Sequence, residues 1–201
     1  MANGKLPNEI LKKILEETPT IQRDDVLIGA KIGVDTAHVQ FDREICVLST
    51  DPITGAADNA GAIGVTITVN DIATSGAEPV GLLLTILAPD GTTHEEIETI
   101  QKDATDAANR LGVQIIGGHT EITSVVNQTV LSVAAIGKLP NEKWMDVKTI
   151  RPGDRVAVSK SLGLEGSAIL ASDRREKLAA VLTREEMEEA AGYLSYLSVL
   201  K

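Results

Sequence analysis

Apolar residues recur along the chain with two different spacings. In residues 6–17 and 93–112 they recur every three to four positions, which predicts two amphipathic helices. A threonine–glutamate capping box within residues 92–96 and Gly112 after the last apolar position mark the ends of the second helix. Short apolar runs, many of them rich in β-branched residues, predict strands instead, at residues 24–32, 37–41, 44–50, 79–89, 113–118 and 128–140.

Residues 60–79 fit both patterns. The β-branched run 65–69 favours a strand by propensity. Ile63 and Ile67 keep a helical spacing, however, and Gly76 is a good helix stop, so we predict a helix here. After the first helix the element order is then β-β-β-α-β-α-β-β. This order predicts the α/β (α+β) class, with a mixed sheet and helices on one face.

A polar connection at residues 139–154 contains two prolines and the only tryptophan of the chain. We place a domain boundary there, which divides the chain into residues 1–145 and 146–201. Beyond the connection the sequence predicts a strand at 154–160, a glycine turn at 161–166 and helices to the end. About fifty residues bury too little apolar surface for a core of their own, so we expect the second domain to be incomplete.

Composition narrows the classes of function. Hydrophobic residues make up 43% and charged residues 24%, as in soluble globular proteins. Aromatic residues make up only 2%, which argues against base stacking, and the net charge of −10 argues against nucleic acid or membrane partners. No signal region or membrane-length apolar run occurs, so a cytoplasmic location is expected. The single cysteine, Cys46, excludes an intramolecular disulfide and is expected to be a buried, inert thiol.

Four segments combine acidic residues with small residues. They are GVDTA (33–37), STDPITG (49–55), NDIATSGAEP (70–79) and GGHTE (117–121). Mg²⁺ prefers carboxylate, phosphate and water oxygens, so acids that converge from several elements would suit a Mg-nucleotide site. The paired glycines 117–118 would let backbone N–H groups approach phosphate oxygens. Taken singly, each acid is explained more simply as a turn former or a surface residue.

In this order and spacing, the four segments resemble the N-terminal domain of the aminoimidazole ribonucleotide synthetase superfamily. The resemblance covers residues 4–140 and continues weakly into residues 150–170. The superfamily includes thiamine-monophosphate kinase, selenophosphate synthetase, the hydrogenase-maturation dehydratase and formylglycinamidine ribonucleotide synthetase. The resemblance implies a sheet whose strands pair across the two-fold axis of a homodimer to form a barrel, with ATP and Mg²⁺ along the interface.

The same resemblance assigns site residues. Asp35, Asp51 and Asp71 match acids that bind metal and phosphate in the family. The remaining nucleotide-binding positions would be Thr50, Asn70, Gly117, Gly118, His119, Thr120 and Glu121. Relatives often carry a carboxylate directly after the paired glycines, where this chain has His119. That residue is open to three interpretations: a phosphate contact, a metal ligand or a structural residue.

Three further residues leave alternatives open, and a fourth has a single interpretation. Lys5 resembles a basic N-terminal segment that some relatives fold over ATP, and is otherwise a solvated lysine. Gly163 and Gly166 resemble a loop that faces the cleft, and otherwise form a plain strand-to-helix turn. His38 is interpreted as an ordinary strand residue.

The function that the resemblance implies is ATP-dependent phosphoryl transfer to a small-molecule acceptor. Phosphoryl transfer needs positioning and charge neutralisation more than a protein nucleophile, which suits a site built from acids and glycines. No residue stands out as the general base. The alternative is a catalytically silent nucleotide-binding and dimerisation module that regulates a partner.

Overall fold

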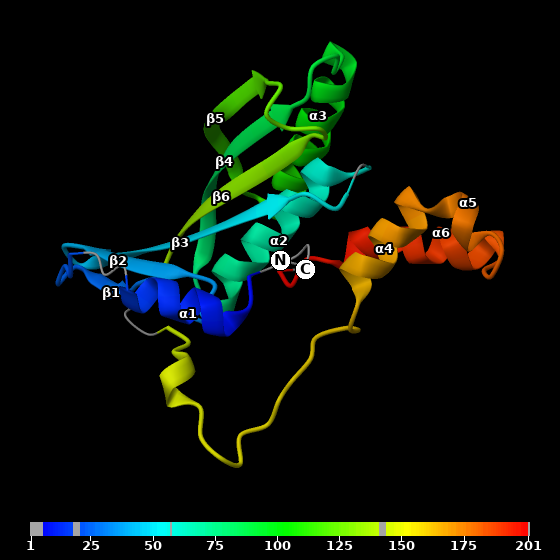
Figure 1. Cartoon of the computed structure of the whole chain (residues 1–201). Coiled ribbons are helices and arrows are strands. Elements are labelled where there is room, and N and C mark those ends of the chain that lie inside the picture. Colours follow the sequence, from blue (N-terminus) through cyan, green and yellow to red (C-terminus); the bar gives the residue numbers. More distant parts are fainter. Residues whose placement is uncertain (1–5, 18–20, 57, 141–143, 201) are drawn as a thin grey trace.

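The structure is a computed structural model that describes residues 6–17, 21–56, 58–140 and 144–200 (Figure 1). Its centre is a six-stranded mixed sheet with the order β1-β2-β3-β6-β4-β5. Only β4 and β5 pair in parallel, and the other neighbours are antiparallel. The strands are β1 (Val26–Ile28), β2 (Ala37–Phe41), β3 (Glu44–Ile53), β4 (Glu78–Ala88), β5 (Gln114–Ile122) and β6 (Val130–Lys138).

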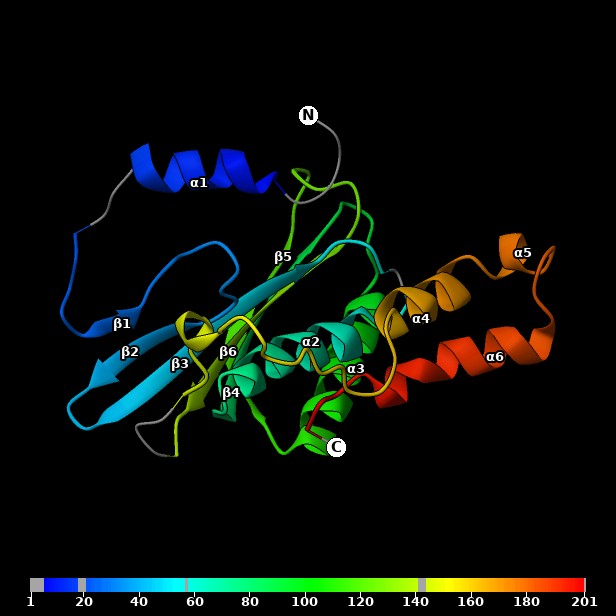
Figure 2. The ribbon, with the colours of Figure 1, turned by 90° about the horizontal axis from the view of Figure 1, so that it is seen from below.

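Two helices form the second layer of the domain. Helix α2 (Ala60–Thr74) packs on β3, β6 and β4, and α3 (His94–Leu111) packs on α2 and β5 (Figures 1 and 2). The core between the layers is aliphatic, as the shortage of aromatic residues requires. The α/β class and the element order predicted for residues 6–140 are confirmed, whereas the barrel across a dimer remains a prediction.

Helix α2 forms although its β-branched residues favour a strand, because it is buried on both sides. A Cβ on Gly61 would lie 2.6 Å from the backbone nitrogen of Ala104 in α3, and a Cβ on Gly64 would lie 3.0 Å from the side chain of Val133 in β6. The two glycines therefore let α2 fit between α3 and the sheet. The hydroxyl of the buried Thr68 donates to the carbonyl of Gly64 at 2.7 Å, so it leaves no unsatisfied polar group.

Helix α3 begins and ends where the sequence predicts. The hydroxyl of Thr93 accepts from the backbone N–H of Glu96 at 3.2 Å, and the Glu96 carboxylate accepts from the backbone N–H of Thr93 at 2.7 Å. Gly112 ends the helix with φ 71°, a left-handed conformation that favours glycine. This helix is the crossover that allows β4 and β5 to run in parallel.

The terminal segments are mainly helical. Helix α1 (Asn8–Glu17) precedes the sheet and contains no buried residue. After β6 the chain forms η1 (Val147–Thr149) and then a helical group beside α2, in which Ile169 and Leu194 pack against the core (Figures 1 and 2). The group consists of α4 (Leu164–Asp173), α5 (Arg175–Leu178), α6 (Arg184–Gly192) and η2 (Tyr193–Tyr196).

The strand predicted at residues 154–160 is wrong. This segment is irregular, and Val156 is 94% exposed. A strand needs a neighbour to satisfy its backbone groups, and none of the described strands pairs with residues 154–160. The boundary between residues 1–145 and 146–201 remains a prediction. None of the described helices combines the length and apolarity needed to cross a membrane.

Candidate functional site

Three aspartates from separate elements meet at one end of α2. Asp71 lies in α2, Asp51 lies within β3, and Asp35 lies in the loop directly before β2. Strand β3 runs three residues further than the sequence predicts and pairs with β6 through Ile53, so Asp51 stands opposite Val133 inside the sheet. Both Asp51 and Asp35 act electrostatically on Asp71. The grouping of the three acids that the sequence suggested is therefore present.

Ser49 joins the aspartates, and the sequence analysis missed it. Its hydroxyl oxygen lies 2.8 Å from Oδ2 of Asp71 and 3.1 Å from the backbone carbonyl oxygen of Asp35. Ser49 and Asp51 are two residues apart in a strand, so their side chains share the face toward α2. That spacing is the signal that could have identified Ser49. Thr50 lies on the opposite face of β3, away from the cluster.

The carboxyl group of Asp71 has an unusual electrostatic environment. Burial raises its pKa to about 7, and the hydrogen bond and charge of Asp51 and the charge of Asp35 add to this rise. The hydrogen bond with Ser49 acts in the opposite direction. Repulsion among the three carboxylates therefore favours a proton on Asp71 up to nearly neutral pH. A bound cation would relieve the same repulsion between the carboxylates.

The cluster offers only oxygen ligands. They are the carboxylates of Asp51 and Asp71, the hydroxyl of Ser49 and the carbonyl of Asp35. Among the described residues, however, no three His, Cys, Asp or Glu side chains are placed to hold an ion by themselves. Mg²⁺ is commonly held by one or two carboxylates together with phosphate oxygens and water. The oxygens present fit a Mg²⁺ ion that is shared with a nucleotide.

The paired glycines lie level with the acid cluster but at a distance from it. Asp51 pairs with Val133, Val133 with Leu84, and Leu84 with Gly118, so one row crosses the sheet from β3 to β5. Three strand spacings separate the ends of the row, roughly 14 Å. Within one chain, the structure does not bring residues 117–121 to the aspartates.

The glycine motif also has a structural explanation. Gly118 has φ 153°, and a Cβ there would overlap the carbonyl oxygen of Leu84 on the neighbouring strand. Further along β5, Nε2 of His119 lies 3.2 Å from Oε2 of Glu121, and both side chains are exposed. Thr120, between them, is exposed as well. The partner of His119 in this structure is therefore Glu121.

Asn70 is engaged elsewhere in the fold. Its Nδ2 donates to the carbonyl of Leu197 at 3.0 Å, and its Oδ1 accepts from the backbone N–H of Val199 at 2.9 Å. The side-chain amide thus holds the C-terminal segment against α2. Gly163 precedes α4 with φ 76°, and Gly166 lies inside that helix, as expected for a plain turn into a helix. Lys5 lies outside the described residues.

His38 belongs to β2, as predicted, but it is a core residue with polar partners. It is 1% exposed, and its Nε2 lies 3.3 Å from Oγ1 of Thr36 and 3.2 Å from Oγ of Ser75. Its ring meets that of Trp144 edge-on at 5.7 Å. Cys46 is half-buried, and burial raises the pKa of its thiol, which suits the inert role predicted for it.

Fold and site together define an α/β domain that carries an oxygen-rich acidic cluster where a strand, a helix and a loop meet. The chain belongs to the family described as AIR synthase related protein, N-terminal domain, whose profile matches residues 33–139. The superfamily suggested by the four sequence segments is confirmed.

Relatives with curated names include enzymes. The chain is 30% identical over 176 residues to a candidate hydrogenase expression/formation protein of Methanocaldococcus jannaschii, covering 85% of this chain and 52% of the relative. It is 31% identical over 140 residues to the carbamoyl dehydratase HypE of Bradyrhizobium diazoefficiens, covering 66% of this chain and 40% of the relative. The chain thus spans about half the length, or less, of these relatives.

Solved structures show the same fold. A complex of AaThiL with AMPPCP and TMP superposes with a TM-score of 0.68 at 19% identity, covering 94% of this chain and 59% of that one. At this identity the likeness shows the fold alone.

Proposed function

We propose that the chain binds Mg-ATP at the cluster of Asp35, Asp51 and Asp71 and takes part in phosphoryl transfer to a small-molecule acceptor. The observation that carries the proposal is the convergence of three aspartates from the loop before β2, from β3 and from α2, with the Ser49 hydroxyl 2.8 Å from Asp71; burial and the two neighbouring carboxylates raise the pKa of Asp71. Such a concentration of unneutralised charge is costly to the fold and is typical of functional sites. Family membership and a solved relative that holds AMPPCP support the same proposal.

The residues of the cluster would have distinct roles. Asp51 and Asp71 would supply carboxylate oxygens to the ion, and the Ser49 hydroxyl would fix the orientation of the Asp71 carboxylate. When bound, Mg²⁺ would neutralise charge on the transferring phosphoryl group. Asp35, in the loop before β2, would form the side of the site opposite α2 and β3 and would add its negative charge to the cluster.

The glycine motif enters the proposal through its place on the sheet. Residues 117–121 lie level with Asp51 but roughly 14 Å away, so they would contact a different part of the nucleotide or the site of a second copy of the chain. A homodimer is part of the proposal. Thr50 faces away from the acid cluster and the Asn70 side chain holds the C-terminal segment, so the site proposed here does not use them as nucleotide contacts.

Calorimetry with ATP tests the proposal. Because the chain has a net charge of −10 and the site is acidic, we expect ATP to bind at least tenfold more tightly with Mg²⁺ than in chelator. Equal affinity in the two conditions would refute the site. Phosphate release should then be followed under saturating Mg-ATP, with candidate acceptors present. Tight binding without turnover would contradict phosphoryl transfer and favour the silent nucleotide-binding module.

A further inference from the structure

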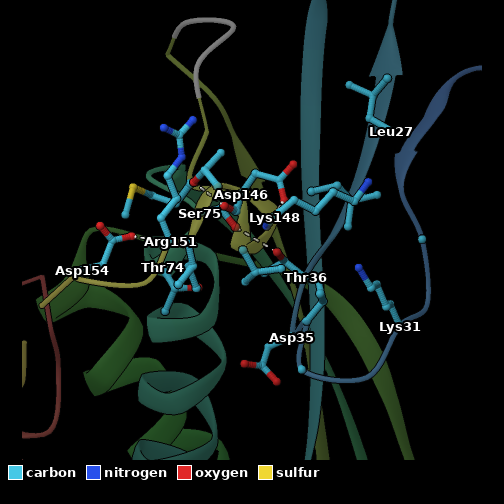
Figure 3. Close-up of a pocket in the computed structure, with 18 of the residues that line it drawn as sticks. Leu27, Lys31, Asp35, Thr36, Thr74, Ser75, Asp146, Lys148, Arg151 and Asp154 are labelled. Atoms are coloured by element: carbon cyan, nitrogen blue, oxygen red, sulfur yellow. Dashed lines mark hydrogen bonds between the residues drawn. The ribbon is translucent and has the colours of Figure 1, made fainter. Parts of the chain in front are cut away.

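A buried polar network joins the two elements that carry Asp35 and Asp71. Thr36 directly follows Asp35 in the loop before β2, and Ser75 ends α2 about one helical turn beyond Asp71. Both residues are buried, and their hydroxyl oxygens lie 2.9 Å apart. With Asp35 they line a cavity of about 840 Å³, in which Figure 3 shows Thr36 between Asp35 and Ser75. The hydroxyl contact therefore ties the loop of one aspartate to the helix of another.

His38 lies behind both hydroxyls and completes the network. It pairs with Val47 of β3, a core residue under α2, so its ring is on the sheet face that α2 covers. Nε2 of the ring lies 3.3 Å from Oγ1 of Thr36 and 3.2 Å from Oγ of Ser75. One ring nitrogen thus reaches both hydroxyls and, through them, both elements of the acid site.

The other ring nitrogen of His38 meets a second buried nitrogen that also lacks a partner. Among the described residues, Nδ1 of His38 and Nε1 of Trp144 are the buried side-chain polar atoms without a hydrogen bond. The two rings meet edge-on at 5.7 Å. The backbone N–H of Met145 donates to the carbonyl of Ser75 at 3.3 Å, which holds the tryptophan segment at the end of α2. A buried polar atom without a partner is costly, so two such atoms on adjoining rings require an explanation.

The indole N–H of Trp144 can only donate, and this property decides the tautomer of His38. If the proton of the neutral imidazole were on Nδ1, two N–H donors would be buried at one ring contact. With the proton on Nε2, Nδ1 can accept from the indole and Nε2–H can donate to the hydroxyls. Burial lowers the pKa of His38 and the charge of Asp146 opposes this, so the ring is neutral near pH 8.

We propose that His38 is a positioning residue of the acid site and that Trp144 sets its tautomer. The indole N–H donates to Nδ1, directly or through one bridging water, and Nε2–H donates to the hydroxyl pair of Thr36 and Ser75. The network then holds Asp35 at a fixed place relative to Asp71. The effect on nucleotide binding rests on the proposed function, whereas the network itself does not.

Nitrogen NMR of the whole chain tests the tautomer without any ligand. The imidazole ¹⁵N shifts distinguish a protonated from an unprotonated ring nitrogen, and the chain has only three histidines and one tryptophan to assign. Near pH 8 we expect a proton on Nε2 of His38 and none on Nδ1. Trp144→Phe keeps an aromatic ring but removes the indole N–H, so this preference should weaken. A proton on Nδ1 in the wild type, or the same tautomer preference in Trp144→Phe, would overturn the role of Trp144.

Two substitutions of His38 test its positioning role. His38→Gln keeps an amide that can serve the hydroxyls, whereas His38→Leu keeps much of the bulk and loses every hydrogen bond. The control is His94→Gln, at the exposed start of α3. In chelator, the amide hydrogens of residues 35–37 should exchange roughly fivefold faster in the leucine variant than in the other two. Its affinity for Mg-ATP, measured well below the Tm, should fall by roughly the same factor.

A merely structural histidine would give a different pattern. His38→Leu would then lower the Tm, while the exchange of residues 35–37 and the affinity for Mg-ATP would equal those of His38→Gln. That outcome would overturn the positioning role. If the wild type does not bind Mg-ATP but exchange is still faster in the leucine variant alone, the proposed function falls and the positioning of the Asp35 loop by His38 stands.

Discussion

The hydroxyl of Ser49 lies 2.8 Å from a carboxylate oxygen of Asp71, although the two residues are 22 positions apart and belong to a strand and a helix. A hydroxyl has one proton, and the carbonyl of Asp35 also lies within reach of it, at 3.1 Å. When Asp71 is protonated, its proton serves the hydrogen bond with Asp51, and the Ser49 hydroxyl can donate to the carbonyl of Asp35. When Asp71 is ionised, its carboxylate and the carbonyl of Asp35 compete for the single hydroxyl proton of Ser49.

The stability of the metal-free protein should therefore depend on Asp71. Its pKa is raised in the folded protein, so its stabilising contribution is complete below its ordinary pKa of 3.8 and is lost as pH rises through about 7. Asp71→Asn mimics the protonated form. After discounting for partial exposure, we expect the variant to gain about 1–2 kcal/mol, or roughly 3–6 °C in Tm, near pH 8. Near pH 5 the gain should be clearly smaller, and it should vanish only below about pH 3.8; thermal scans in chelator that show an equal gain at pH 5 and pH 8 would contradict this.

Asp51→Asn separates a functional acid from a structural one. Removing one of several clustered charges should leave the Tm of the ligand-free protein unchanged or slightly higher. The variant should lose most of the stabilisation that Mg-ATP gives, because a ligand stabilises only through its affinity for the folded state. Asp90→Asn, in the exposed turn after β4, is the matched control and should respond to Mg-ATP like wild type. A large loss of Tm with a normal Mg-ATP response would make Asp51 a structural residue of β3 and not a nucleotide-site acid.

The packing of α2 predicts a strong effect at Gly61. A methyl group there would meet the backbone of α3, which does not move aside as a flexible side chain would. We expect Gly61→Ala to lower the free energy of unfolding by about 1–3 kcal/mol, measured in urea. Gly166→Ala in α4 is the control, since nothing lies within 4 Å of the added Cβ. That variant should be neutral or more stable by up to about 1 kcal/mol.

Apolar side chains on β4 and β5 predict self-association. Val80, Leu83, Ile116 and Ile122 are each between 40% and 50% exposed, although all four lie in strands of the central sheet. Pairing with a second copy would cover them. We expect light scattering to give a dimer at micromolar concentration, and Ile116→Asp to give a monomer. Val125→Asp, at a loop position that is 82% exposed, should remain dimeric. A monomeric wild type would contradict the homodimer.

The amide of Asn70 should protect the C-terminal segment. Asn70→Ala removes both hydrogen bonds to the backbone of residues 197 and 199. One lost bond of about 1 kcal/mol corresponds to roughly fivefold faster exchange of the Val199 amide hydrogen. Asn109→Ala on the exposed surface of α3 should leave that exchange unchanged. If Mg-AMPPCP accelerates the exchange in wild type, Asn70 also serves the nucleotide.

Local sequence patterns predicted most of the helices and strands, but they did not predict which elements pair with or pack against one another. Thr93 and Gly112 fix the ends of α3 through contacts within the helix itself, so the sequence predicts them. The helix at Ala60–Thr74 was predictable only from its spacing and its glycine stop, because its β-branched residues favour a strand and its burial overrides them. The strand expected at 154–160 failed for the opposite reason, since a strand depends on a partner elsewhere in the chain.

The acid site was also predictable only in part, because some of its residues are defined by contacts with distant parts of the chain. Asp35, Asp51 and Asp71 could be selected as a group from their motifs, whereas Ser49 is defined by a contact between β3 and α2. The distance from Asp51 to the glycine motif follows from the strand order, which no local pattern encodes. The two hydrogen bonds of the Asn70 side chain are made to Leu197 and Val199, which lie 127 and 129 positions further along the chain.

The strand order also sets the sequence of events during synthesis. Strand β6 lies between β3 and β4, and it pairs with Cys46–Ile53 on one side and with Glu78–Leu87 on the other. A nascent chain that has not yet released residues 130–138 therefore carries two long strands with an open edge, and α2 has an incomplete surface to cover. Folding of the domain must wait for β6, and the contacts it then closes are distant in sequence, which makes this step slow and exposed to aggregation.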